Sequence, residues 1–250
     1  EYIKKTFPGL GEVMIEDDTF PVNKARVVDF CEKIIAKKIK LKWSTNARAD
    51  VDYETLKLMK KAGCRSLLVG FERGDQKILD KMDKSLDLEK ARQFAKDSNR
   101  AGILVNAAFM AGNPGETYET LEKTLNYAKS LPVDVAQFFP LMVYPGTKAY
   151  NKFLDRSIVP NSIAGWQNYI VTDSNGGISI NKNFTGPEIK QIASKFNRKF
   201  FMRLSHWPSM LRTISNFSDF TRLSRGGIYL LVNYMKEMKK SIFQNKQTVN

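Results

Sequence analysis

The sequence is poor in the residues that build disulfide frameworks and metal sites. Its 250 residues include only two cysteines, Cys31 and Cys64, and one histidine, His206. Two cysteines cannot form a disulfide framework, which favours a reducing compartment such as the cytoplasm. Because the histidine lies near the end of the chain, a serine–histidine–aspartate triad in the preceding body and a multi-histidine metal site are excluded.

The sequence also lacks long apolar runs and an ordinary start. No stretch of about 18 apolar residues exists, so no membrane-spanning helix is predicted. Hydrophobic residues make up 42% and charged residues 26%, which is typical of globular proteins and excludes disordered and low-complexity classes. The first residue is Glu1 and no leader follows it, so we expect a piece cut from a longer protein.

Positive charge is abundant and unevenly distributed. The formal net charge is +14, and residues 187–250 carry +9 of it, with twelve Lys or Arg and three Asp or Glu. The two parts of the chain therefore favour different partners. We expect a catalytic or ligand-binding body over residues 1–150, an irregular connection over 151–186 and a basic, mostly helical tail over 187–250.

The body alternates short apolar runs with amphipathic helical stretches. Asn23, Asp52 and Thr117 are suitable helix N-caps, and Gly63 and Gly102 end helices directly before apolar runs. This alternation predicts an α/β fold with parallel strands and chemistry at their carboxyl ends, either as an open sheet or as part of a barrel. The five expected strands are Glu12–Ile15, Leu41–Thr45, Ser66–Gly70, Ile103–Met110 and Val133–Phe139.

Polar residues follow the first three apolar runs. Asp17 and Asp18 follow the first, and they predict either a solvated loop or a wall that recognises hydroxyl or ammonium groups. Asn46 and Arg48 follow the second; the alternative for Arg48 is a surface ion pair with Asp50 or Asp52. Glu72 follows the third, between Gly70 and Gly74, which allow a ligand to approach the backbone closely.

A glycine-rich turn follows the fourth run. Gly112, Pro114 and Gly115 form a rigid connection into the helix that Thr117 begins. Such turns often bind anions, but Glu116 opposes a phosphate and no Gly-Lys-Ser/Thr string marks a P-loop. The two cysteines are interpreted as buried packing residues, since Cys31 lies on the apolar face of a helix and Cys64 beside a strand.

These strings, in this order and at this spacing, resemble the radical S-adenosylmethionine (radical SAM) superfamily. The most similar subgroup carries a cobalamin-binding domain and includes magnesium-protoporphyrin ester cyclases and hopanoid-modifying enzymes. The strings that carry the resemblance over residues 12–150 are Glu16-Asp17-Asp18-Thr19-Phe20, Asn46-Ala47-Arg48-Ala49-Asp50, Ala62-Gly63-Cys64, Val69-Gly70-Phe71-Glu72-Arg73-Gly74, Lys84, Gly112-Asn113-Pro114-Gly115-Glu116-Thr117 and Tyr144-Pro145-Gly146-Thr147.

The resemblance implies a partial six-stranded (β/α) TIM-like barrel that lacks its first strand. In this family a [4Fe–4S] cluster passes an electron to S-adenosylmethionine (SAM), which yields a 5′-deoxyadenosyl radical. By resemblance, Asp17 and Asp18 lie near the methionine amino group, Asn46 and Arg48 near the cofactor, and Glu72 near the ribose. Lys84 corresponds to a base that faces the methionine carboxylate, and the turn of Gly112, Pro114 and Gly115 lies near adenine.

The sequence departs from the family at the cluster. The family holds it with three cysteines spaced Cys-x-x-x-Cys-x-x-Cys, and no such motif is present. We therefore expect no metal ligands in this chain, and we expect it to be inactive alone although part of an enzyme. The resemblance further implies cobalamin through an upstream domain, a ferredoxin or flavodoxin as electron donor, and a lipid-like or tetrapyrrole substrate.

Two alternatives remain from the residues themselves. One is a (β/α)-barrel hydrolase or lyase that uses Glu72 and Lys84. The other is a non-enzymatic, peripheral association with an anionic membrane surface, or with nucleic acid, which is less favoured because no RNA-binding motif is present. The competing interpretation of the tail is that its aromatic residues simply pack onto the barrel. The membrane or nucleic-acid alternative rests on interleaved aromatic and basic residues, namely Phe200, Phe201, Trp207, Phe217, Phe220 and Tyr229 with Arg198, Lys199, Arg203, Arg212, Arg222 and Arg225.

Overall fold

A computed structural model describes residues 2–80, 86–154 and 177–203, together with Ile214, Thr221 and Arg225. The chain divides into two compact units, Glu1–Met202 and Arg203–Asn250. The first unit contains all the strands and helices discussed below. In the described part of the chain, no helix is long and apolar enough to cross a membrane.

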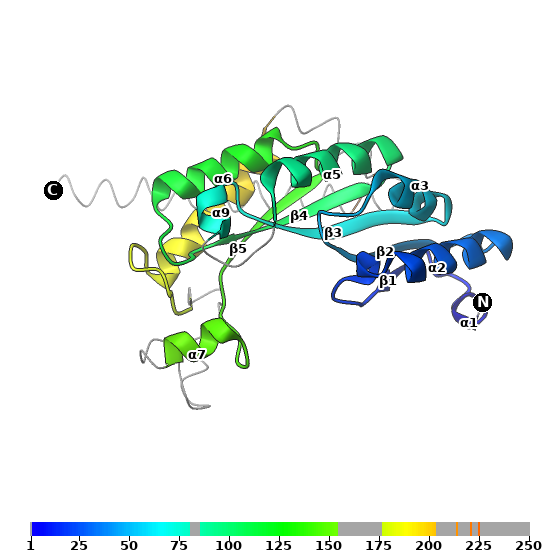
Figure 1. Cartoon of the computed structure of the whole chain (residues 1–250), viewed down its shortest axis with the longest axis horizontal. Coiled ribbons are helices and arrows are strands. Elements are labelled where there is room, and N and C mark those ends of the chain that lie inside the picture. Colours follow the sequence, from blue (N-terminus) through cyan, green and yellow to red (C-terminus); the bar gives the residue numbers. More distant parts are fainter. Residues whose placement is uncertain are drawn as a thin grey trace. The chain divides into compact units, whose positions relative to one another are not determined.

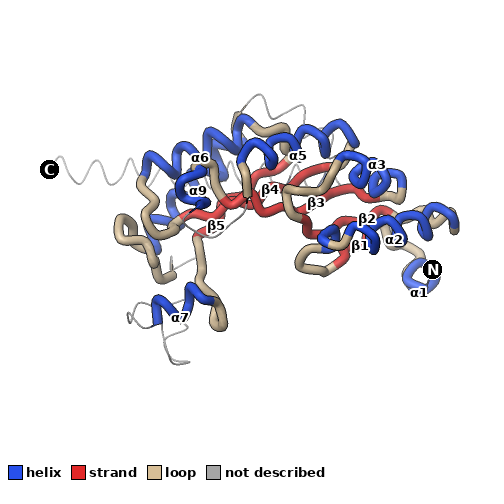
Figure 2. Tube along the Cα trace, viewed as in Figure 1, coloured by secondary structure: helices blue, strands red, loops and turns tan. Residues whose placement is uncertain are grey.

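The first unit is built on one parallel sheet of five strands in the order β1-β2-β3-β4-β5 (Figure 2). The strands are β1 (Glu12–Ile15), β2 (Lys42–Ala47), β3 (Cys64–Glu72), β4 (Leu104–Ala111) and β5 (Val135–Pro140). Every neighbouring pair is parallel. Because all these strands run parallel, their carboxyl ends meet at one edge of the sheet.

Helices fill the connections between the strands. They are α2 (Lys24–Ala36), α3 (Tyr53–Lys61), α5 (Leu88–Ala101) and α6 (Tyr118–Ser130), and α3, α5 and α6 lie along one side of the sheet (Figure 1). Shorter elements are α1 (Tyr2–Thr6), the 3₁₀ helix η1 (Phe20–Val22), α4 (Gln76–Asp80) and α7 (Lys148–Leu154). The last described helix, α9 (Gly186–Phe201), packs beside β5 and α6.

The expected helix signals are confirmed. Asn23, Asp52 and Thr117 each accept a backbone N–H as N-caps of α2, α3 and α6. Gly102 ends α5 in the left-handed conformation with φ of 76°, where glycine avoids the steric penalty of a Cβ atom.

The core lies between the sheet and its helices. Side chains along the strands alternate between buried and partly exposed, as expected when one face of the sheet is covered. An aromatic row crosses the sheet, because Phe71 and Phe109 stack at 5.8 Å, Phe109 and Phe138 at 5.2 Å, and Phe138 meets Phe196 of α9 at 5.5 Å. Phe139 faces the other way and is 42% exposed.

The predicted α/β fold with five parallel strands is therefore confirmed, and the strand boundaries differ by a few residues. The expected tail boundary at residue 187 falls at the first turn of α9, which belongs to the first unit. Phe200 of that helix is fully buried and Phe201 packs against the same core, as in the packing interpretation. Trp207, Phe217, Phe220 and Tyr229 lie outside the described residues.

Candidate functional site

A cavity of about 500 Å³ lies at the carboxyl ends of the first three strands. Asp18 follows β1, Arg48 follows β2 and Glu72 ends β3, so three separate connections contribute to its wall. Four carboxylates and two basic side chains line the cavity. Its lining residues are Asp18, Thr19, Ala47, Arg48, Ala49, Asp50, Gly70, Glu72, Leu86, Asp87 and Lys90.

Asp17 supports this wall rather than lining it. Its Oδ2 atom pairs with Arg26 Nη2 at 3.0 Å, and its Oδ1 atom accepts the Thr19 backbone N–H at 3.0 Å. The Asn46 Nδ2 atom donates to the Asp17 carbonyl oxygen at 3.1 Å. Asn46 Oδ1 is buried and has no hydrogen-bond partner within the described chain. The segment after β1 is thus fixed to β2, next to an acceptor atom that a ligand's N–H or O–H group could use.

Arg48 makes the surface ion pair that the sequence offered as an alternative. Its Nε atom lies 3.0 Å from Asp50 Oδ2, and both side chains are more than half exposed. Because both residues also line the cavity, the pair forms part of its rim. An exposed pair of this kind adds little stability, so either partner can turn toward a charged ligand at low cost.

Glu72 has an unusual backbone conformation. Its φ is +63°, in the left-handed region that residues with a Cβ atom rarely adopt. The Arg73 N–H donates to the Phe71 carbonyl at 2.7 Å, which closes a γ-turn around Glu72. The register between β3 and β4 shifts at the same point. Strain of this kind costs about 1–3 kcal/mol and is concentrated at functional sites.

The next residue, Arg73, was not singled out from the sequence, and its side chain is fully buried. Its Nη1 atom lies 3.2 Å from Glu116 Oε1, and Glu116 is 1% exposed. Burial lowers the pKa of the Arg73 guanidinium. Burial also raises the pKa of the Glu116 carboxyl, against the opposing effects of Arg73 and of the turn amides. The only sequence signal for this pair is a charged residue in each of two glycine-containing strand ends.

The turn after β4 is occupied by its own glutamate. Glu116 Oε2 accepts the backbone N–H groups of Gly112 and Asn113, both at 2.8 Å. These amides are therefore not free for an anion. Gly112 is also covered, because a Cβ atom there would lie 2.5 Å from Ile189 Cδ1 of α9. Pro114 and Gly115 are exposed but do not line the strand-end cavity.

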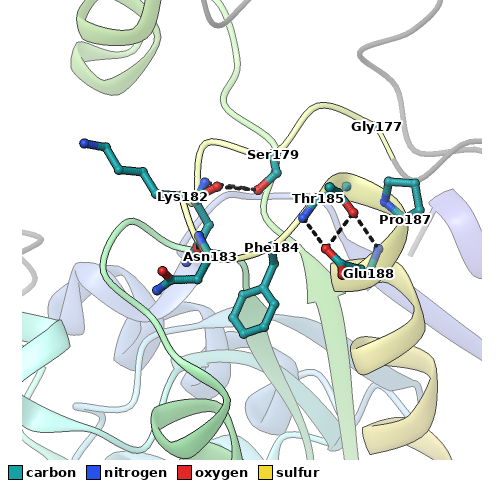
Figure 3. A pocket seen from close by; sticks show the side chains of 10 residues that line it. Gly177, Ser179, Lys182, Asn183, Phe184, Thr185, Pro187 and Glu188 are labelled. Carbon is teal, nitrogen blue, oxygen red and sulfur yellow. Dashed lines mark hydrogen bonds between the residues drawn. The ribbon is translucent and has the colours of Figure 1, made fainter.

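The segment before α9 is attached to the same turn. Asn183 Nδ2 donates to the Glu116 carbonyl at 2.8 Å, and Asn181 Nδ2 donates to the carbonyls of Asn113 and Glu116. A second cavity, of about 510 Å³, lies within this segment (Figure 3). All its lining residues fall between Gly177 and Glu188, and the dashed lines show Thr185 and Glu188 bonded to each other as the cap of α9. None of its lining residues belongs to the end of a strand.

The structure thus brings together Asp18, Arg48 and Glu72, places Asp17 and Asn46 beside them, and places Gly112, Pro114 and Gly115 at a separate turn. Lys84 lies outside the described residues. Lys90, at the start of α5, lines the cavity and is a basic residue that the sequence reasoning missed. It lies in the first helical turn after a loop, where no local pattern distinguishes it from a solvated lysine.

The described residues offer no place for a metal centre. Among them, no group of three or more histidine, cysteine, aspartate or glutamate side chains could hold an ion. Cys31 and Cys64 are 0% and 1% exposed and belong to the hydrophobic core. Burial raises the pKa of Cys31 to about 11 and also raises that of Cys64, so both thiols are held in the neutral form, which is a poor metal ligand.

Comparison with protein families decides the relationship. The family model for the radical SAM superfamily matches residues 1–128, which is more than half of the chain. The chain belongs to the radical SAM superfamily. Its five parallel strands correspond to a partial radical SAM barrel.

Two curated relatives show where in the superfamily the similarity lies. An uncharacterized methyltransferase of Pyrococcus horikoshii is 28% identical over 196 residues, 78% of this chain and 42% of the relative. The anaerobic magnesium-protoporphyrin IX monomethyl ester cyclase of Cereibacter sphaeroides is 31% identical over 153 residues, 59% of this chain and 25% of the relative. The chain thus spans less than half the length of these relatives.

A solved structure supports the fold. The radical SAM methyltransferase TsrM of Kitasatospora setae, with cobalamin and a [4Fe–4S] cluster bound, superposes with a TM-score of 0.57 at 20% identity. The match covers 65% of this chain and 33% of that protein. At this identity the likeness concerns the fold of the barrel strands and helices.

Proposed function

We propose that the cavity at the ends of β1, β2 and β3 binds SAM, and that the chain is the SAM-binding part of a radical SAM methyltransferase or cyclase. The observation that carries this proposal is the convergence of Asp18, Arg48 and Glu72 from three strand ends on one cavity. Ligand sites in parallel α/β folds form at such carboxyl ends. Membership of the radical SAM superfamily supports SAM as the ligand.

The charge of the cavity suits this ligand. Four carboxylates outnumber two basic groups along its wall. SAM carries an ammonium, a sulfonium and a carboxylate, so its net charge is positive, and its ribose offers two hydroxyl donors. Carboxylates accept hydrogen bonds from ammonium and hydroxyl groups, and a lysine pairs with a carboxylate. In this proposal Asp18 holds the ammonium, Glu72 the ribose diol, and Lys90 serves the carboxylate in place of, or together with, Lys84.

The remaining parts of the function rest on relatives. Bound SAM supplies the group or radical precursor for the reaction. The described residues do not fit an iron–sulfur cluster. A small apolar or tetrapyrrole-like acceptor is proposed because the Cereibacter relative is named for a magnesium protoporphyrin. Cobalamin and a ferredoxin or flavodoxin donor are proposed for the whole protein. The hydrolase or lyase alternative depends on Lys84, outside the described residues.

The proposal is tested by equilibrium dialysis of labelled SAM against residues 1–250. Glu72→Gln keeps the size of the side chain but removes its charge, and we expect the Kd to rise about tenfold, or about 1.4 kcal/mol. Glu89→Gln is the matched control, because Glu89 is an exposed glutamate on the same helix as Lys90 and does not line the cavity. S-adenosylhomocysteine, which lacks the sulfonium charge, should bind more weakly than SAM.

Two outcomes contradict the proposal. One is the absence of saturable SAM binding by the unmodified chain. The other is an equal Kd for the Glu72→Gln and Glu89→Gln variants, which would place the ligand away from the strand-end cavity.

A further inference from the structure

The strained turn at Glu72 lies between two segments that cannot easily move. On one side, Phe71 is fully buried and stacks on Phe109. On the other side, the Gly74 N–H donates to Thr124 Oγ1 at 3.1 Å. A Cβ atom at Gly74 would lie 2.4 Å from Tyr127 Cβ, so the backbone there is pressed directly onto α6. Glu72 is therefore held from both sides.

The Arg73 side chain, which lies between Phe71 and Gly74, is a third point at which this segment is fixed. It is fully buried and reaches Glu116 at 3.2 Å, while the other oxygen of Glu116 accepts the amides of Gly112 and Asn113. A guanidinium in the interior without a carboxylate partner is strongly unfavourable, so Arg73 is tied to the turn after β4. Arg73 is fully buried, whereas its neighbour Glu72 lines the cavity. Fixing Arg73 in the interior therefore limits how the backbone at Glu72 can turn.

The Glu72 carboxylate does lie on the cavity side. A Cβ atom at Gly70 would come within 3.1 Å of Glu72 Oε1, so the carboxylate is folded back over Gly70, and both residues line the cavity. If the γ-turn relaxed to an ordinary extended conformation, the direction of the side chain at position 72 would change.

We propose that Arg73 is a positioning residue: through its buried ion pair with Glu116 it holds the strained γ-turn that places the Glu72 carboxylate in the SAM cavity. This inference rests on the proposed function for the ligand, but the link between the ion pair and the turn is independent of any ligand.

The first test is a double-mutant cycle on SAM affinity. Arg73→Met removes the charge at similar length, and Arg73→Met combined with Glu116→Leu removes both buried charges, which avoids leaving one unpaired. We expect the Kd for SAM to rise about tenfold in the combined variant, as in Glu72→Gln, and to rise no further when Glu72→Gln is added. Arg73→Lys, which keeps the positive charge, should bind SAM more tightly than Arg73→Met and more weakly than the unmodified chain. Arg100→Met removes a charge at the other end of α5, where Arg100 is exposed and does not line the cavity, and it should leave the Kd unchanged.

A second test needs no ligand. Glu72→Gly relieves the backbone strain, so it should raise the midpoint of thermal unfolding. The increase should be about 3 °C larger when the Arg73–Glu116 pair is present than in the variant that lacks both charges. Equal shifts in both backgrounds would show that the pair does not hold the turn and would overturn the inference. Wild-type SAM affinity in the combined variant, or losses that add to that of Glu72→Gln, would do the same. If the unmodified chain binds no SAM, the proposed function fails, and the unfolding measurements alone decide the role of Arg73.

Discussion

Asn197 of α9 hydrogen-bonds to both backbone groups of Phe138 in β5. Its Oδ1 atom accepts the Phe138 N–H at 2.8 Å, and its Nδ2 atom donates to the Phe138 carbonyl at 3.1 Å. The side-chain amide therefore takes the place of a peptide group in a neighbouring strand. Because β5 is the last strand of the sheet order, α9 closes that edge at this residue.

The first prediction concerns this edge. Asn197→Leu should lower the free energy of unfolding by about 2 kcal/mol, because two backbone groups of Phe138 lose their partner. Urea denaturation measures the loss, and sedimentation velocity should show self-association through the opened strand. Asn197→Asp, which keeps the acceptor and loses the donor, should fall between. Unchanged stability in the leucine variant would show that the contact is not formed in solution.

The second prediction concerns the cap of α3. Burial tends to raise the pKa of Asp52, but hydrogen bonds from Lys24 and Thr55 outweigh it and lower the pKa from 3.8 to about 2. A carboxyl with a lowered folded pKa contributes stability that is complete above its unfolded pKa and is lost as the pH falls through its folded pKa. The stabilising effect of Asp52 should therefore disappear between about pH 4 and pH 2.

Two variants check this cap. Asp52→Ala should cost about 1 kcal/mol near neutral pH. Asp52→Asn should cap α3 nearly as well but should not titrate, so the wild type should lose stability relative to it in acid. Asp29→Asn is the control for a surface aspartate, since its pair with Lys33 is exposed. Parallel acid curves for the wild type and the Asp52→Asn variant would contradict the assignment.

The third prediction concerns the thiols. Both cysteines are buried, and burial raises the pKa of Cys31 to about 11, so neither thiolate forms at ordinary pH. Iodoacetamide at about pH 8 should leave the folded chain unmodified and should alkylate both cysteines in urea. Mass spectrometry counts the added groups. Rapid labelling of one cysteine in the folded chain would place that thiol at the surface.

The fourth prediction concerns iron. Residues 1–250 contain two cysteines, one fewer than a site-differentiated cluster of this family requires, and both lie in the core. Reconstitution of this chain with iron and sulfide should therefore give no charge-transfer absorbance of an iron–sulfur cluster. A stoichiometric cluster on this polypeptide would falsify the prediction.

The fifth prediction compares two glycines. Gly74→Ala should destabilise the chain by about 1–3 kcal/mol, because the new methyl group would meet Tyr127 Cβ at 2.4 Å and Thr124 Cα at 2.9 Å. Gly11→Ala is the control, since no atom lies within 4 Å of the position of its Cβ, and it should change stability by less than about 0.5 kcal/mol. Equal effects on the midpoint of urea unfolding would contradict the contact of Gly74 with α6.

The fold could be predicted from the sequence because its signals are local. Caps such as Asp52 and glycines such as Gly102 mark helix ends within a few residues, and apolar runs mark the strands between them. Parallel pairing then follows from the alternation of strand and helix. Part of the site was predicted for the same reason, since Asp18, Arg48 and Glu72 each follow a strand directly.

The rest of the site depends on contacts that sequence patterns do not record. Arg73 and Glu116 are 43 residues apart, and each alone looks like a charge in an exposed loop. The sequence predicts only that the charge of Glu116 opposes phosphate binding at the turn. In the structure its carboxylate accepts hydrogen bonds from the backbone amides of that same turn. The left-handed conformation of Glu72 also has no sequence signal, because it is imposed by tertiary packing on both sides.

Because α9 caps β5, the two edges of the sheet differ. Within the described ranges, β1 pairs only with β2, and it has four residues. With its β5 edge capped, the described sheet can pair with a second copy only along β1. Two copies that paired along β1 would form a closed dimer, whereas a sheet with two open edges could extend into a filament.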